Sequence, residues 1–305
     1  MRTIKLGKTD LTVPVIAVGC MRLAGHDAAG AERFVKTAVE AGAYFFDHAD
    51  IYGGGRCEEI FGEAIGMNPA VREKIILQSK CGIYNGTYDF SKEHILSSVD
   101  GSLRRLKTDY LDVLLLHRPD ALMEPEEVAE AFDILYDGGK VLNFGVSNQN
   151  PGHIRLLSKY IKQPISVNQL QFGIAHASLV SEGTNVNTPN DFSTVKDGGV
   201  LDFCRLNDIT IQPWSPMQYG FIEGTFINNP KFAELNKKID EIAERYGVSN
   251  TTIAIAWILR HPARMQPVTG TMRTERLLDS IKAADIEITR GEWYEIYRAA
   301  GYPLP

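Results

Sequence analysis

The sequence predicts a single (β/α)8 barrel, and three observations support this prediction. Eight short apolar runs alternate with longer stretches in which apolar residues recur at helical spacing. Some runs are continuously apolar, as in LDVLLLH, which is typical of strands buried on both faces of a parallel sheet. No linker divides the 305 residues, so we expect one domain over residues 1–305.

The predicted strands and helices follow one another along the chain. The strands are Val15–Gly19, Tyr44–Asp47, Ile75–Lys80, Val113–His117, Asn143–Ser147, Ser166–Gln169, Thr210–Pro213 and Gln266–Thr269. The helices are Ala31–Ala41, Ser91–Leu106, Pro125–Tyr136, Pro151–Tyr160, Lys231–Tyr246, Asn250–Leu259 and Arg273–Ala283.

Three segments add to this plain barrel. Residues 3–19 contain Gly7-Lys8-Thr9-Asp10 at their centre, which predicts a β-hairpin before the first barrel strand, placed as a plug in the barrel floor. A last helix, Gly291–Ala300, gives the fold extra helical structure at its C-terminal end. Residues 172–199 form a long polar connection, which is either functional or mobile, or a tolerated surface insertion.

Composition narrows the class of protein. The formal net charge is -6 without an extended basic cluster, which argues against nucleic acid or an anionic membrane as a partner. The four cysteines form no CxxC pair, which is typical of a reducing cytosol, and the N-terminus lacks an apolar signal core. No apolar run reaches the roughly eighteen residues of a membrane span, so we expect a cytoplasmic protein. The sequence does not indicate its oligomeric state.

Four ionisable residues stand at or just after predicted strand ends. Asp47 closes FFD, Tyr52 follows it in the next loop, Lys80 closes IILQSK, and His117 closes DVLLLH. Active sites of such barrels lie at the C-terminal ends of the strands, so we expect the four side chains to meet there.

The chemistry of this group is coherent. A buried lysine needs a counter-charge, which Asp47 can supply. The Lys80 ammonium beside the Tyr52 oxygen is expected to lower the pKa of the phenol. His117 can donate or accept a hydrogen bond at a substrate oxygen. The set suits protonation of an oxygen that becomes negative, such as a carbonyl oxygen whose carbon receives a hydride.

Each residue also has a plainer interpretation. Lys80 could be a solvated rim residue, His117 could cap a turn, and Asp47 could cap the next helix. Their occurrence together at successive strand ends makes the joint site the better hypothesis. A metal site is not expected, because Asp47, His48 and Asp50 point to alternating faces and no further ligands complete a set.

The four residues at the predicted strand ends and the motifs around them resemble those of an aldo-keto reductase. The motifs that carry the resemblance are FDHADIYG, GVSN, VNQLQ, PWSPMQ, YGVSNTTIAIAWILRHP and PVTGTMRTERLLDS, in this order over nearly the whole chain. The resemblance assigns Asp47, Tyr52, Lys80 and His117 to the family's catalytic tetrad, with Tyr52 as the general acid. His48 departs from the usual Asp-Thr-Ala, and we interpret it as a packing or hydrogen-bonding residue.

A hydride donor needs a binding site. No GxGxxG motif follows a strand, but Gly270 and Thr271 leave the last predicted strand and enter a helix whose N-terminus suits a phosphate. Arg273 and Arg276 lie three residues apart on that helix, where they are either a clamp for an adenosine 2′-phosphate or a solvated pair.

The resemblance favours the clamp and implies NADPH/NADP+ as the cofactor. It assigns Ser147, Asn148 and Gln169 to the carboxamide of the nicotinamide, Trp214 to stacking on its ring, Ser215 and Met217 to the pyrophosphate or ribose, Met21 and Arg22 to the ribose, and Asp279 and Ser280 to the adenine. The last two replace the Glu-Asn that the family often has there.

We therefore expect an NADPH-dependent oxidoreductase that reduces aldehydes or ketones, with a small carbonyl compound as its partner. The alternative is a regulatory or sensor protein that binds nicotinamide nucleotide with little turnover. A barrel hydrolase would need a metal set or a nucleophile with its base, and the sequence offers neither.

Overall fold

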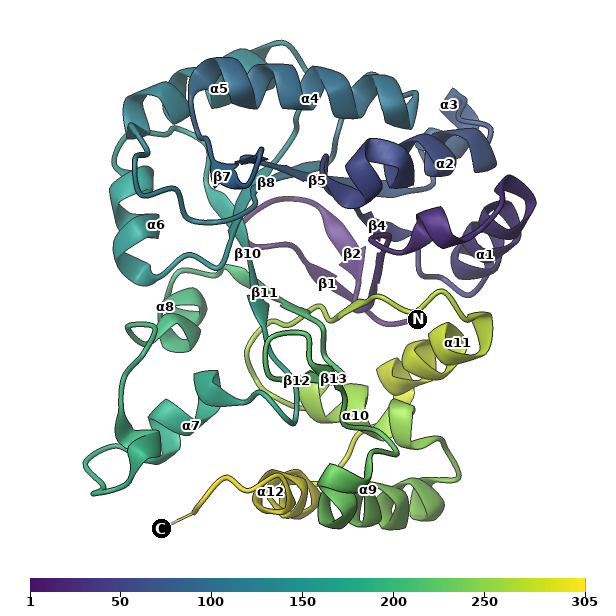
Figure 1. Ribbon diagram of the computed structural model, residues 1–305, viewed down its shortest axis with the longest axis vertical. Coiled ribbons are helices and arrows are strands. Elements are labelled where there is room, and N and C mark those ends of the chain that lie inside the picture. The colour runs from purple at the N-terminus through teal and green to yellow at the C-terminus, as the bar shows by residue number, and fades with distance from the viewer. Residues whose placement is uncertain (305) are drawn as a thin grey trace.

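The apolar runs of the sequence form a closed barrel of eight parallel strands (Figure 1). The structure, a computed structural model, describes residues 1–304. The strands follow one another around the barrel in chain order, and the last pairs with the first. They are β3 (Ala17–Gly19), β4 (Phe45–Asp47), β5 (Ile76–Cys81), β8 (Val113–Leu116), β9 (Phe144–Ser147), β10 (Ile165–Gln171), β11 (Thr210–Trp214) and β14 (Val268–Thr269). The predicted barrel is confirmed, with differences only at strand ends.

Helices surround the barrel, and every predicted helix is present (Figure 1). These are α1 (Ala28–Glu40), α4 (Lys92–Leu106), α5 (Pro125–Asp137), α6 (Pro151–Ser158), α9 (Ala233–Tyr246), α10 (Asn250–Leu259), α11 (Thr274–Lys282) and α12 (Arg290–Ala299). Side chains cap several of their first turns: Ser91, for example, accepts from the His94 amide, as an N-cap should. Four helices were not predicted, namely α2 (Arg56–Ala64), α3 (Pro69–Arg72), α7 (Ser178–Thr184) and α8 (Val200–Leu206).

Helix α2 was missed because its buried face is partly polar. Glu58 lies on that face and is fully buried, which breaks the apolar periodicity of the sequence. The structure compensates the carboxylate: Ser79 donates to it at 2.6 Å and Arg105 at 2.8 Å. The charged residue on the buried face of α2, Glu58, thus marks a buried ion pair with Arg105.

The predicted hairpin at the start of the chain is confirmed and closes the barrel floor, the N-terminal end of the strands. Strands β1 (Thr3–Lys5) and β2 (Thr12–Pro14) pair in antiparallel fashion, and the hairpin crosses the centre of the ring of strands in Figure 1. Leu6 and Val13 are fully buried and pack with Phe45 and Leu115 inside the barrel. The floor is therefore sealed by apolar contacts.

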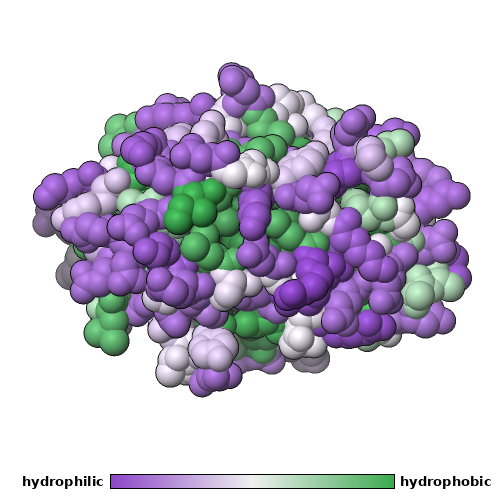
Figure 2. Space-filling model, turned by 90° about the horizontal axis from the view of Figure 1, so that it is seen from above, coloured by the Kyte–Doolittle hydropathy of each residue, from purple (hydrophilic) through white to green (hydrophobic). Residues whose placement is uncertain are grey.

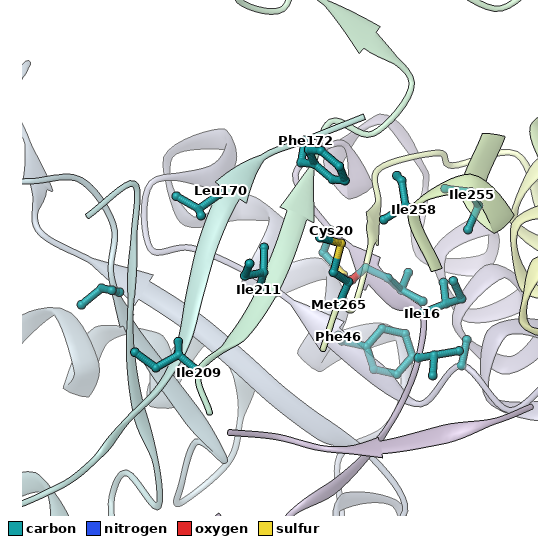
Figure 3. Close-up of a cluster of buried hydrophobic side chains, with 14 of the residues drawn as sticks. Ile16, Cys20, Phe46, Leu170, Phe172, Ile209, Ile211, Ile255, Ile258 and Met265 are labelled. Carbon is teal, nitrogen blue, oxygen red and sulfur yellow. The ribbon is translucent and has the colours of Figure 1, made fainter. Parts of the chain in front are cut away.

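A second apolar layer lies between the strands and the helices. Figure 3 shows part of it: Ile211 and Phe172 come from β11 and the end of β10, and Ile255 and Ile258 come from α10.

Seen from above, over the α4 and α5 side, the surface is mostly hydrophilic with a smaller apolar area near its middle (Figure 2). Within residues 1–304, no helix has the length and apolar character to cross a membrane.

The long connection after β10 is more ordered than its composition suggested. It contains α7 and the short 3-10 helix η3 (Asp191–Ser193). Tyr302 accepts a hydrogen bond from the Ala177 amide at 2.7 Å, stacks on Tyr297 at 4.9 Å and contacts the edge of Phe192 at 5.7 Å. The connection is therefore fastened to the C-terminal helical region.

The remaining elements are short. The mouth of the barrel, at the C-terminal ends of the strands, carries the 3-10 helices η1 (Leu23–Gly25) and η2 (Tyr52–Gly55) and two small hairpins, β6 (Ile83–Tyr84) with β7 (Thr87–Tyr88) and β12 (Gln218–Tyr219) with β13 (Gly224–Thr225). The 3-10 helices η4 (Pro230–Phe232) and η5 (Ala283–Asp285) precede α9 and follow α11.

The floor contact makes Gly7 sensitive to substitution. Its φ is +56°, and a Cβ atom there would lie 2.5 Å from the backbone oxygen of Ser166. Gly66 has nearly the same φ, +55°, but no atom within 4 Å. We predict that Gly7→Ala lowers the free energy of unfolding by about 2–4 kcal/mol and Gly66→Ala by only about 1 kcal/mol, as measured by urea unfolding. Equal losses would mean that the hairpin is not held tightly against the barrel.

Candidate active site

The structure brings together the four polar residues that the sequence placed at strand ends. Asp47 is the last residue of β4, Lys80 lies near the end of β5, His117 follows β8, and Tyr52 begins η2. Asp47, Lys80 and His117 are buried, whereas Tyr52 is partly buried. These four residues are called the tetrad below.

Lys80 is the centre of the tetrad. Its side chain is fully buried, and its Nζ lies 2.8 Å from the Asp47 carboxylate, 3.0 Å from the Tyr52 hydroxyl and 2.7 Å from the carbonyl oxygen of His48. Three acceptors thus satisfy the three N–H groups of the ammonium. Burial acts to lower the pKa of Lys80, but Asp47 and Tyr52 outweigh burial and the pKa is raised. Lys80 is therefore held as a cation.

The pKa of Tyr52 corrects one expectation. Lys80 does act to lower it, as predicted, but burial has the larger effect and Asp47 adds to it, so the net pKa of the phenol is raised. Tyr52 therefore keeps its proton in this state. Because the ammonium can only donate, Tyr52 accepts from Lys80 and its own O–H is free to donate elsewhere.

His117 completes the tetrad as a neutral ring. Burial, Lys80 and Arg118 together lower its pKa well below the usual value. The ring meets Tyr52 edge-on, with 5.9 Å between the ring centroids, and its Nδ1 has no partner within residues 1–304. A neutral imidazole here can offer one N–H to an oxygen placed beside the Tyr52 hydroxyl.

Four buried glutamines form a network below the tetrad, and the sequence analysis named only one of them, Gln169, as a contact of the nicotinamide. Gln78 donates to Asp47 Oδ1 at 2.6 Å and to Gln212 at 2.8 Å, and Gln169 donates to the same two acceptors at 3.1 and 3.0 Å. Gln212 donates to Gln266 at 2.8 Å, and Gln266 donates to the Pro14 carbonyl of the hairpin at 2.7 Å. A signal was available, because each glutamine is a polar residue within a predicted barrel strand.

The residues expected to contact nicotinamide surround the tetrad on the β9, β10 and β11 side. Ser147 donates to the Gln169 carbonyl at 3.0 Å, and Asn148, with φ at +53°, accepts from the Trp214 indole at 3.3 Å. Gln169 uses its amide nitrogen for Asp47, which leaves its side-chain oxygen for another donor. Ser215 also has positive φ, and Met217 packs on the core.

The residues expected to hold phosphate lie at the β14 end. Arg22 donates to the Gly270 carbonyl at 3.1 Å, which joins the β3 and β14 ends of the mouth, and Met21 beside it is exposed. The Thr271 hydroxyl accepts from the Arg273 amide at 3.2 Å. Arg273 and Arg276 are exposed at the start of α11, and neither forms an ion pair within residues 1–304.

Asp279 and Ser280 have other contacts. Asp279 pairs with Lys282 at 3.1 Å, and the Ser280 hydroxyl donates to the Arg276 carbonyl at 2.9 Å within the same helix. Both side chains keep acceptor capacity beside these contacts, and their role towards adenine remains a prediction.

Two further observations concern the surface away from the tetrad. A groove of about 620 Å³ lies at the floor of the barrel, between the hairpin turn, α5 and the segment before β10, away from the tetrad. Within residues 1–304, no group of three or more His, Cys, Asp or Glu side chains is placed to hold a metal ion.

Comparison with known proteins identifies the chain. The fold is a closed parallel barrel, and Asp47, Tyr52, Lys80 and His117 lie together at its mouth. The profile of the aldo/keto reductase family matches residues 15–300, and the chain belongs to this family.

Characterised and uncharacterised relatives agree with this membership. An uncharacterized oxidoreductase of Bacillus subtilis, YcsN, is 34% identical over the full length of both chains. A 6-dehydroglucose reductase of Novosphingobium aromaticivorans is 32% identical and covers 99% of this chain and 96% of its own. The crystal structure of the thermostable aldo-keto reductase Tm1743 with the inhibitor epalrestat has the same fold, with a TM-score of 0.79, 24% identity, and 98% and 100% of the two chains covered.

His48 is the unusual residue of this site. Its side chain points away from the tetrad and packs edge-on against Phe61 with 4.6 Å between ring centroids, and among the described residues 1–304 neither ring nitrogen has a partner. Burial and then Lys80 lower its pKa to about 3. Of the two roles expected for it, the structure shows packing and no hydrogen bond. A neutral polar ring without partners costs stability.

We predict that His48→Leu raises the free energy of unfolding at pH 7 by about 1–3 kcal/mol. Because the pKa of His48 is lower in the folded protein, the unfolded protein takes up the proton first as the pH falls. Stability is therefore lost from pH ~6.5 towards pH ~3, by up to about 1.4 kcal/mol per pH unit. Urea unfolding between pH 7 and 4.5 should show a shallower loss for His48→Leu. Parallel curves for the two proteins would contradict this account.

Proposed function

We propose that this protein is an NADPH-dependent carbonyl reductase with Tyr52 as its general acid. The observation that best supports this proposal is the hydrogen bond from the buried Lys80 ammonium to the Tyr52 oxygen. A cation in this position does little for a protonated phenol but stabilises the phenolate that remains after the proton leaves.

The residues expected to hold the cofactor fit a nicotinamide nucleotide. The carboxamide needs both donors and acceptors, and Gln169 offers a side-chain oxygen that has no protein donor. Two exposed arginines without acidic partners stand at the N-terminal end of α11, where an anion is favoured. When bound, NADPH supplies the hydride that the carbonyl carbon receives.

The chain itself manages the proton. The carbonyl oxygen lies between Tyr52 and His117, and the neutral imidazole donates a hydrogen bond that helps to polarise the carbonyl. As the carbon gains two electrons with the hydride, the oxygen takes the proton of Tyr52. Lys80 stabilises the resulting phenolate, Asp47 keeps Lys80 in place, and water from solvent later returns a proton to Tyr52.

We predict that Tyr52→Phe lowers kcat for carbonyl reduction by about 10²–10⁴-fold, because the proton donor is lost. The Kd for NADPH, followed by tryptophan fluorescence, should change by less than about threefold, since the phenyl ring keeps the shape of the site. Tyr84→Phe, at an exposed tyrosine of β6, is the matched control and should keep full activity.

Two outcomes would argue against the proposal. Near-normal turnover by Tyr52→Phe would remove Tyr52 as the acid. Negligible turnover of bound NADPH by the native protein over a broad panel of aldehydes and ketones would favour a nucleotide sensor instead.

We also predict that replacing both Arg273 and Arg276 by alanine weakens NADPH binding by about tenfold or more and leaves NADH binding within about twofold, since only NADPH carries the 2′-phosphate. Fluorescence titration of both nucleotides measures this. The same substitution at Arg290, on the remote helix α12, is the control. Equal weakening of both nucleotides would mean that the arginines do not read the 2′-phosphate.

A further inference from the structure

Arg118 lies beside the tetrad but has no part in the mechanism above. It follows His117 directly, and its side chain is half-buried. Its guanidinium Cζ lies 5.3 Å from the centre of the Trp214 ring and 5.9 Å from that of Phe221. The side chain thus reaches from the end of β8 to the indole at the end of β11.

The charge of Arg118 is not neutralised by the protein. Within residues 1–304, its guanidinium forms no ion pair, and the groups that act on it most after burial are two phenols, Tyr88 and Tyr52. Burial lowers the pKa of Arg118 and the two phenols act in the opposite direction. Other partly buried arginines of this chain differ: Arg72 pairs with Asp112 at 2.7 Å and Arg105 pairs with Glu58 at 2.8 Å.

Aromatic rings hold the guanidinium without occupying its hydrogen-bonding edge. Cation–π contacts with Trp214 and Phe221 fix the position of the group, whereas its five N–H donors lie in the plane of the fork and favour a carboxylate or a phosphate. An arginine held in this way can bind an anion that a ligand supplies.

The barrel order indicates where that anion would come from. Around the barrel, β8 lies four strands away from β14 in either direction, so Arg118 starts opposite the phosphate-binding end proposed for the cofactor. It follows His117 directly and helps to lower the pKa of that ring, and Tyr52 acts electrostatically on Arg118. The backbone of Arg118 therefore lies on the side of the mouth where the carbonyl compound is expected, and its guanidinium extends over the mouth to Trp214.

We propose that Arg118 is a specificity-determining residue that binds an anionic group, such as a carboxylate, on the carbonyl substrate. This inference rests on the proposed carbonyl reduction and deepens it, because it names the class of substrate: an aldehyde or ketone that carries a negative charge at some distance from its carbonyl. The exposed Phe221 ring also offers apolar surface for the part of the substrate between the two groups.

The test compares aldehydes that differ in charge. Reduction of 3- and 4-carboxybenzaldehyde is measured against their methyl esters, with NADPH saturating, for the native protein and for Arg118→Met, Arg118→Lys and Arg155→Met. Arg155 is the matched control, because it too sits over an aromatic ring, with its Cζ 5.0 Å from the Phe203 centroid, but it belongs to α6 on the outside of the barrel.

The native protein should prefer at least one acid over its ester by about tenfold or more in kcat/KM, mainly through KM. Arg118→Met should abolish this preference, Arg118→Lys should retain part of it, and Arg155→Met should leave it as it is. The Kd for NADPH should remain within about threefold in all variants.

The failures are distinguishable. If acids and esters are reduced equally well by the native protein, the inference about Arg118 is wrong while carbonyl reduction stands. If Arg118→Met weakens NADPH binding without changing the preference, the guanidinium serves the cofactor's phosphates instead. If none of these aldehydes, nor a wider carbonyl panel, is reduced, the proposed function fails first.

Discussion

The buried ammonium of Lys80 is the constraint on which the rest of the site depends. An unpaired charge at this depth would be very costly, and replacing either partner would leave the other uncompensated. Asp47 supplies the opposite charge, and Gln78 and Gln169 hold the second carboxylate oxygen. The glutamine amides hold Asp47, Asp47 pairs with Lys80, and Lys80 donates to the Tyr52 hydroxyl. The position of this hydroxyl therefore depends on contacts that begin inside the barrel.

The barrel interior separates into two layers. Near the floor it is apolar, with Leu6 and Val13 of the hairpin packed against Phe45 and Leu115. Above this layer the inward-facing side chains are amides and the tetrad. Because the hairpin seals the floor, the tetrad faces solvent only at the mouth, and its electrostatic interactions act in a medium of low polarity.

Much of this arrangement could be predicted from the sequence. Strands were predicted because short apolar runs alternate with helical patterns, and the tetrad was predicted because parallel strands end at one edge. Helix α2 could not be predicted by periodicity, since Glu58 stands on its buried face. The net pKa of Tyr52 was predicted with the wrong sign, because the burial that dominates it depends on how the loops close over the phenol. His48 was predicted to pack or to form hydrogen bonds; the packing is found, but that its ring has no hydrogen-bond partner within residues 1–304 appears only when all its neighbours are placed.

The hydrogen bonds of the glutamine network have a fixed donor-to-acceptor direction. Its two ends, the Pro14 carbonyl and the Asp47 carboxylate, can only accept hydrogen bonds, so each terminal amide must turn its nitrogen outward. The side-chain oxygen of Gln212 then accepts from Gln169 and its nitrogen donates to Gln266, so both ends of this amide are used. The side-chain oxygen of Gln169 is left facing away from Asp47. No single amide can be reversed without setting donor against donor or acceptor against acceptor. The floor hairpin and the mouth of the barrel therefore share one hydrogen-bond polarity, and the orientation of the Gln169 amide is linked, through Gln212 and Gln266, to a carbonyl group at the opposite end of the barrel.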